Sequence, residues 1–151
     1  MFGVDNLETL FVVTAFLFQI VLIIHFALRK WRFHLAMRYG WVVYALSVPA
    51  AAVSVVLLLN GKSSWLWVSG FVYLIWAVFG YTAEYARGIT TWRNPIRWSV
   101  FGPYLFLYLA TNMLYWWPLA LVSRPLLYVY AVLYIVSTIL NATSHKASSV
   151  G

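Results

Sequence analysis

The sequence predicts an all-α integral membrane protein, a bundle of five transmembrane helices. Of its 151 residues, 64% are hydrophobic and 9% are charged, whereas a soluble domain is about 45–50% apolar and about 25% charged. The mean hydropathy is +0.85. Apolar stretches of about 20 residues, the length that crosses a hydrocarbon core of about 30 Å, recur along the chain. At this length we expect one membrane domain over residues 1–151.

The expected helices, in chain order, are residues 7–28, 39–59, 65–86, 100–120 and 124–142. Polar and turn residues separate them in three connections, at 29–38, 60–64 and 87–99. The fourth connection has two interpretations: Pro118 and Pro125 bracket a tight turn, or the fourth helix ends near Trp117. We expect the polar tail 143–151 to be frayed.

The first two helices differ in how they pack. Asp5 and Glu8 precede the first apolar run, where a signal peptide would be basic, so we expect that run to remain as a spanning helix. One of its faces carries Thr14, Phe18, Val21 and His25, with Gln19 near mid-depth. The second helix aligns Ser47, Ala51 and Ser54 around Pro49, which predicts a close-packing face with a kink.

The last three helices each carry an inward stripe of small, hydroxyl or amide residues, the kinds that favour helix contacts in lipid. On the third helix the stripe is Gly70, Tyr73, Ala77, Gly80 and Glu84, while Val68, Val72, Ile75 and Phe79 form a lipid-facing stripe. On the fourth it is Tyr104, Tyr108, Thr111 and Tyr115, with Asn112 beside them. On the fifth it is Tyr130, Tyr134, Ser137 and Asn141.

Basic residues predict the orientation. Those of the first connection, the third connection and the tail are Arg29, Lys30, Arg32, Arg38, Arg87, Arg93, Arg97 and Lys146. The opposite side carries only Lys62 and Arg124. This positive-inside bias places the N-terminus outside and the C-terminus in the cytoplasm of a multi-pass cell-membrane protein. Tryptophans at both expected boundaries form aromatic belts, and Trp76 alone sits mid-span.

Glu84 is the one acidic residue after position 8, and it lies in the last turn of the third helix. One interpretation is an ion pair with Arg87, Arg93 or Arg97 that anchors the following loop. The other is a functional carboxylate, because ionisable groups within membrane helices mark functional sites. The predicted threading brings Glu84, His25 and Asn141 to similar depth, so Glu84 and His25 are the candidate catalytic residues.

A wider set of polar residues near that depth and along the tyrosine stripes forms the candidate ligand-binding set: Tyr81, Arg87, Arg93, Arg97, Tyr104, Tyr108, Asn112, Tyr134 and Asn141. The arginines fit either the positive-inside bias or a site for an anionic headgroup. The tyrosines fit either packing between helices or a cavity for a flat hydrophobic ligand.

Several classes of chemistry are disfavoured by composition. Cysteine is absent, and three acidic residues supply neither an intramembrane carboxylate pair nor an acidic cluster for Mg²⁺. No metal site is expected and a bis-histidine haem is disfavoured. The sequence does not identify a cofactor. The net charge of +7 is explained by topology, so nucleic acid is not an expected partner.

Three functional hypotheses remain open, and the chain is not assigned as an enzyme or a non-enzyme. The first is a non-catalytic membrane subunit or scaffold that packs with partner helices, or with a second copy, and orders lipids or pigments. The second is a membrane-embedded enzyme or binding protein for a lipid, sterol, isoprenoid or quinone, acting through Glu84. The third is a small proton-linked transporter that uses the same carboxylate.

Overall fold

The computed structural model describes residues 5–89 and 97–148, with side chains as far as Ser144. These residues are almost entirely helical and include no strand, which confirms the all-α class. Five helical spans within them are long and apolar enough to cross a membrane: Asn6–Trp31, Phe33–Leu59, Ser64–Ala86, Trp98–Val122 and Arg124–Ser144. The chain therefore has the architecture of a multi-span membrane protein.

Each span consists of one or more helical elements. The first is α1 (Asn6–Trp31), and the second comprises α2 (Phe33–Tyr39), α3 (Trp41–Ala45) and α4 (Ser47–Leu59). The third joins α5 (Ser64–Tyr81) to the π-helical turn η1 (Thr82–Ala86). The fourth joins α6 (Trp98–Trp116) to α7 (Leu119–Val122), and the fifth is α8 (Arg124–Ser148).

The first connection is shorter than the sequence predicts. The expected non-helical stretch at 29–38 is wrong, because α1 continues to Trp31 and α2 begins at Phe33. Arg32 alone breaks the helix, with φ −139° and ψ 60°. Basic side chains in the last turn complement the helix dipole, and their long stems let the charged groups reach polar surroundings. The basic residues Arg29 and Lys30 therefore do not end α1.

The other helix ends follow the turn residues. α6 ends at Trp116, which matches the alternative in which the fourth helix ends near Trp117. Ser123 is extended, with φ −164° and ψ 122°, and lets the chain reverse into α8. The second span is interrupted at Leu46, three residues before Pro49, since a proline ring displaces the carbonyl four residues before it. The interruption lies close to the position where the sequence predicts a kink.

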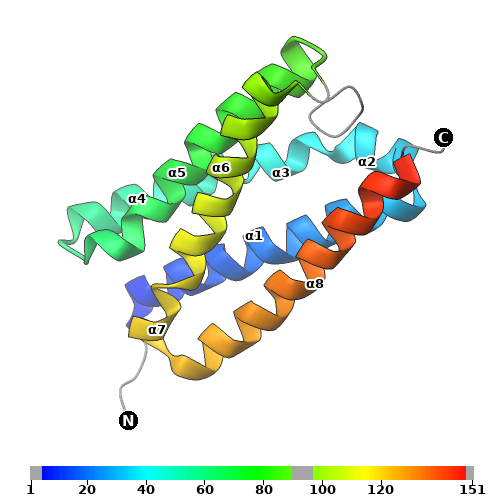
Figure 1. The fold of residues 1–151 in the computed structure, drawn as a ribbon. Helices are drawn as coiled ribbons and strands as arrows, with labels where there is room; N and C mark the ends of the chain where they lie inside the picture. Colours follow the sequence, from blue (N-terminus) through cyan, green and yellow to red (C-terminus); the bar gives the residue numbers. More distant parts are fainter. Residues whose placement is uncertain (1–4, 90–96, 149–151) are drawn as a thin grey trace.

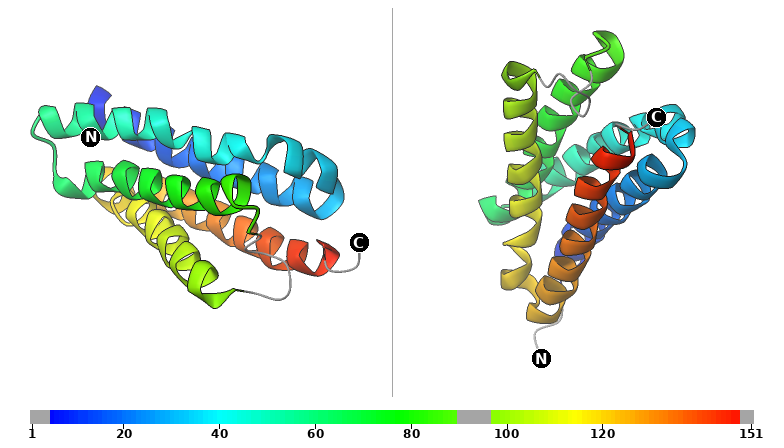
Figure 2. Two further views of the ribbon diagram at one scale, coloured as in Figure 1. Left: turned by 90° about the horizontal axis from the view of Figure 1, so that it is seen from above. Right: turned by 45° about the vertical axis from the view of Figure 1, so that its right-hand side comes forward.

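The axes of the spans are roughly aligned, and successive spans run in opposite directions (Figures 1 and 2). Three pairs of helices lie side by side. α1 packs along α8, α4 along α5, and α5 along α6. α6 and α8 meet at α7 and then diverge, α6 following α5 and α8 following α1, as all three ribbon views show. The described chain begins and ends at opposite ends of the bundle, as an odd number of spans that alternate in direction requires.

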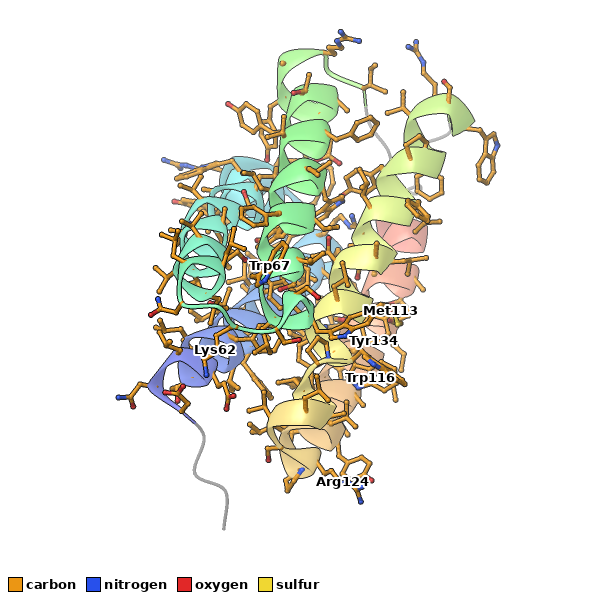
Figure 3. The ribbon with its side chains drawn as sticks, turned by 90° about the vertical axis from the view of Figure 1, so that its left-hand side faces the viewer. Lys62, Trp67, Met113, Trp116, Arg124 and Tyr134 are labelled. Carbon is orange, nitrogen blue, oxygen red and sulfur yellow. The ribbon has the colours of Figure 1, made fainter. Side chains whose placement is uncertain are left out.

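Those two ends differ in composition. We call the end where α1 stops and α6 starts the basic end; it carries Arg29, Arg32, Arg38, Arg87 and Arg97. We call the other the N-terminal end, where Asp5 meets Lys62. Figure 3 shows Lys62, Trp116 and Arg124 toward this N-terminal end.

The core combines small residues with packed aromatic rings. A Cβ added at Gly70 would lie 2.1 Å from Ser54 Oγ, so α4 and α5 approach closely at that point. Trp76 is 1% exposed and its ring centroid lies 5.5–5.8 Å from those of Tyr44, Tyr73, Tyr104 and Tyr108. The predicted inward stripes of the third and fourth helices are largely buried, as expected.

Candidate functional site

Glu84 lies in an irregular segment of the third span. The π-helical turn of Thr82–Ala86 continues α5, and the Arg87 amide donates back to the Thr82 carbonyl at 3.0 Å. Gly88, at φ 62°, then turns the chain away from the helix axis. A π turn widens the helix by one residue and is frequent at functional sites. Here it places the half-buried Glu84 toward the second and fourth spans.

Tyr44 connects Glu84 to α6. Its hydroxyl donates to Glu84 Oε2 at 2.7 Å and lies 3.3 Å from the Tyr104 hydroxyl. Because the one Tyr44 proton goes to the carboxylate, Tyr104 is the donor in the second hydrogen bond. Tyr44 is 7% exposed, so this relay is shielded from bulk solvent.

Arg29 supplies a cation on the facing side. It is 7% exposed, and its Nε donates to Ser144 Oγ at 2.8 Å. A terminal guanidinium nitrogen donates to Asn141 Oδ1 on the same helix, α8. Arg29 also lies within electrostatic range of Glu84, Tyr44 and Tyr104. A buried guanidinium in a membrane helix is costly unless such partners surround it.

All five spans therefore contribute a polar side chain near the basic end. We call these the polar cluster: Arg29 from α1, Tyr44 from α3, Glu84 from η1, Tyr104 from α6, and Asn141 and Ser144 from α8. The predicted nearness of Glu84 and Asn141 in depth agrees with this arrangement. Chemically, the cluster offers a carboxylate that accepts protons and a guanidinium that binds anions or carbonyl oxygens.

His25 lies against a different neighbour. It flanks Gly40, where an added Cβ would lie 3.1 Å from His25 Cε1 and 2.8 Å from the Tyr85 hydroxyl. His25 also borders an apolar surface groove of about 200 Å³ that Val21, Ala36, Tyr39 and Val43 help to line. Its role as a catalytic partner of Glu84 stays a prediction.

Three of the remaining predicted binding residues, Tyr81, Arg87 and Arg97, are exposed. Tyr81 is 49% exposed and stacks on Tyr85 with ring centroids 5.2 Å apart. Arg87 and Arg97 are exposed at the two sides of the third connection, and Arg93 lies outside the described residues. The predicted ion pair between Glu84 and one of these arginines stays a prediction.

Tyr108, Asn112 and Tyr134 lie deeper in the bundle than the polar cluster. Tyr108 and Asn112 are buried on α6, and Asn112 Nδ2 donates to the Tyr108 carbonyl at 2.9 Å. Tyr134 is half-buried on α8. Tyr108 lies within electrostatic range of Tyr134 on α8 and Arg29 on α1.

A separate charged group lies at the N-terminal end. Lys62 Nζ lies 2.6 Å from Asp5 Oδ2 and 3.7 Å from Glu8 Oε1. The hydrogen bond from Lys62 lowers the pKa of Asp5, and the same bond raises the pKa of Lys62. Asp5 and Glu8 also form a capping box on α1. These contacts hold the second connection against the start of α1.

The sequence did not identify Arg29 and Tyr44 as site residues. Arg29 lies one turn beyond His25 on the inward face of α1, so it appears there once the helix is extended past residue 28. Tyr44 lies one turn before Ser47 on the small-residue face of the second span, and its hydrogen bonds with Glu84 and Tyr104 depend on the helix order around the bundle.

Within residues 5–89 and 97–144, no three His, Asp or Glu side chains come close enough together to hold a metal ion. No known family model, curated protein or solved structure matches this chain.

Proposed function

We propose that the chain is a membrane-embedded binding protein for a lipid-soluble molecule whose polar head binds at the polar cluster. The observation that carries the proposal is the convergence of Arg29, Glu84 and Tyr44 from three spans within the bundle. Packing alone does not require a carboxylate and a buried guanidinium. Ionisable groups in membrane spans are costly, and for that reason they mark candidate functional sites.

The partial exposure of two residues of the cluster supports lateral access from the lipid. Tyr104 on α6 and Asn141 on α8 are both only half-buried. The two helices diverge toward the basic end (Figure 2). A ligand tail lies in the lipid between these helices while its head contacts Arg29 and Glu84. This arrangement suits a lipid, isoprenoid, sterol or quinone, whose polar atoms are confined to one end.

Native mass spectrometry of the protein extracted gently from its own membrane tests this function. The wild type and the control variant Glu8→Gln carry one defined hydrophobic small molecule, whereas Glu84→Gln loses most of it. Glu8 is a matched control because it is an acidic residue at the opposite end of the bundle. Equal occupancy in all three proteins, or no bound molecule in any of them, contradicts the proposal.

A second candidate function is a scaffold that packs with another membrane subunit or a second copy. It is favoured by α8, in which 11% of the apolar stretch is buried, against 33–44% in the other four spans. In the same mass spectrum this function gives additional polypeptide chains in fixed stoichiometry. A monomer carrying one small molecule favours the binding protein instead.

For orientation we propose that the basic end faces the cytoplasm of the cell membrane. The support is the positive-inside rule applied to the arginines gathered there. A reporter enzyme fused after residue 151 is then active only in its cytoplasmic form. Activity of the extracytoplasmic reporter contradicts this orientation.

A further inference from the structure

Two surface grooves run along α5, one on each side of a row of its side chains. The row consists of Leu74, Val78 and Thr82, and all three residues line both grooves. Side chains four residues apart lie one above the other on the same face of a helix, so the row forms a ridge. We call this row the α5 ridge. It is the common wall of two neighbouring grooves.

The two grooves differ in their other walls. The first, of about 260 Å³, is also lined by Ala77 and Tyr81, one position before the ridge residues. The second, of about 520 Å³, is also lined by Ile75 and Phe79, one position after them. Successive residues of a helix are about 100° apart, so these pairs lie on opposite sides of the ridge. The second span closes the first groove with Trp41, Tyr44, Ala45, Ser47 and Val48. Most of the lining side chains are apolar, so each groove suits an alkyl chain.

The α5 ridge ends beside an arginine because of the π-helical turn. In an α-helix the residue next to Thr82 on the same face would lie three or four positions further on. In the π turn the Arg87 amide donates to the Thr82 carbonyl at 3.0 Å, so the backbone of Arg87 lies directly over Thr82. Arg87 is exposed. The irregular turn thus brings a cation into line with the ridge at the basic end.

The facing wall of the first groove also ends beside an arginine. Trp41, Ala45 and Val48 recur at the helical spacing, and Arg38 lies three residues before Trp41. Gly40 between them keeps helical angles, φ −59° and ψ −25°, so exposed Arg38 shares their face. A Cβ at Gly40 would lie 2.8 Å from the Tyr85 hydroxyl, so the segments that carry Arg38 and Arg87 are neighbours.

We propose that an anionic phospholipid of the surrounding bilayer binds astride the α5 ridge, with one acyl chain in each groove and its phosphate on Arg38 and Arg87. Two chains joined at one headgroup match two grooves that share a wall, and two guanidinium groups complement a phosphate. Trp41 and Tyr81, which are 48% and 49% exposed, have the amphipathic rings that favour headgroup level. This inference goes beyond the proposed function and does not depend on it.

Lipid retention from vesicles of defined composition tests the headgroup. The protein is reconstituted with equal parts of phosphatidylglycerol and phosphatidylcholine of the same acyl chains, and native mass spectrometry counts the lipids retained after detergent extraction. The wild type prefers phosphatidylglycerol, and Arg38→Gln or Arg87→Gln lowers that preference about fivefold. Arg124→Gln, at an exposed arginine of the N-terminal end, is the matched control and leaves it unchanged. Equal retention of both lipids by the wild type, or an equal loss in Arg124→Gln, overturns the proposal.

The same measurement tests the two grooves. Ala45→Leu fills the first groove and lowers the retention of phosphatidylglycerol, whereas Ala52→Leu, at an exposed alanine of the same span outside both grooves, does not. Lysophosphatidylglycerol has the same headgroup and one chain, and the wild type retains it less than the two-chain lipid because one groove stays unfilled. Equal retention of the one-chain and two-chain lipids, or equal retention by the two alanine variants, overturns the two-groove site.

Discussion

The Tyr44 hydroxyl donates a hydrogen bond of 2.7 Å to the Glu84 carboxylate, 40 residues further along the chain. The bond joins the second and third spans at the basic end. Its geometry depends on Gly80, one turn before Glu84, because a Cβ at position 80 would lie 2.7 Å from the Tyr44 ring. Because Gly80 has no side chain, it leaves room for the Tyr44 ring, whose hydroxyl donates to the Glu84 carboxylate.

Replacing Tyr44 with Phe keeps the ring and removes this hydroxyl. Glu84 loses a buried donor, and Tyr104 loses its acceptor. Hydrogen bonds to charged groups contribute about 1.5–3 kcal/mol, so we expect the free energy of unfolding to fall by about that amount. Thermal unfolding in detergent measures the change. A Tm equal to that of the exposed control Tyr128→Phe contradicts the relay.

Gly80→Ala tests the close approach of Tyr44 to α5. The added methyl group meets the Tyr44 ring and hydroxyl at 2.7–2.9 Å, which is closer than van der Waals contact allows. Overpacking of this kind costs about 1–3 kcal/mol. The control is Gly102→Ala on α6, which has no heavy atom within 4 Å of the added group and leaves stability unchanged or slightly higher. Equal stability of the two variants refutes the contact.

Arg29→Gln tests the connection between α1 and α8. Loss of the guanidinium leaves Asn141 and Ser144 without their donor, which costs about 1–3 kcal/mol for buried groups. We expect a lower Tm and faster proteolysis near the end of α8. Arg32→Gln serves as the control, since Arg32 is exposed at the adjoining helix break. If both variants behave alike, Arg29 does not hold the two helices together.

The charged group at the N-terminal end predicts a specific pH dependence. The pKa of Asp5 is lowered from 3.8, so its contribution to stability is present above that pH and is lost as pH falls through the lowered pKa. The pKa of Lys62 is raised from 10.5, so its contribution is lost only as pH rises through the raised pKa. The difference in Tm between wild type and Lys62→Met should stay constant from pH 5 to 9 and shrink below pH 3.8. An undiminished difference in acid contradicts the pairing.

Most of the fold could be predicted from the sequence because lipid imposes simple rules. Span lengths follow the thickness of the hydrocarbon core, and small or polar residues mark the helix contacts. Gly70 and Gly80 identify the face of α5 that meets α4 and Tyr44. The threading also placed Glu84 and Asn141 at matching depth, where the polar cluster lies.

The sequence predicted Glu84 and Asn141 as site residues but missed Arg29 and Tyr44, for two physical reasons. Basic residues were assumed to lie outside the spans, which excluded Arg29, although a long side chain can bond across the last turn of two helices. The partner of Glu84 depended on which helices are neighbours around the bundle. That order is set by how large rings such as Trp76 fit against several helices, and a single sequence does not record it.

We propose above that the polar cluster binds the head of a lipid-soluble molecule. The most direct measurement is an experimental structure of the wild-type protein grown in a lipid mesophase with its co-purified molecule retained. We expect density from that molecule in contact with both Glu84 and Arg29, and extending between α6 and α8. Density confined to the outer lipid-facing surface, with Glu84 and Arg29 contacting protein atoms alone, would contradict it.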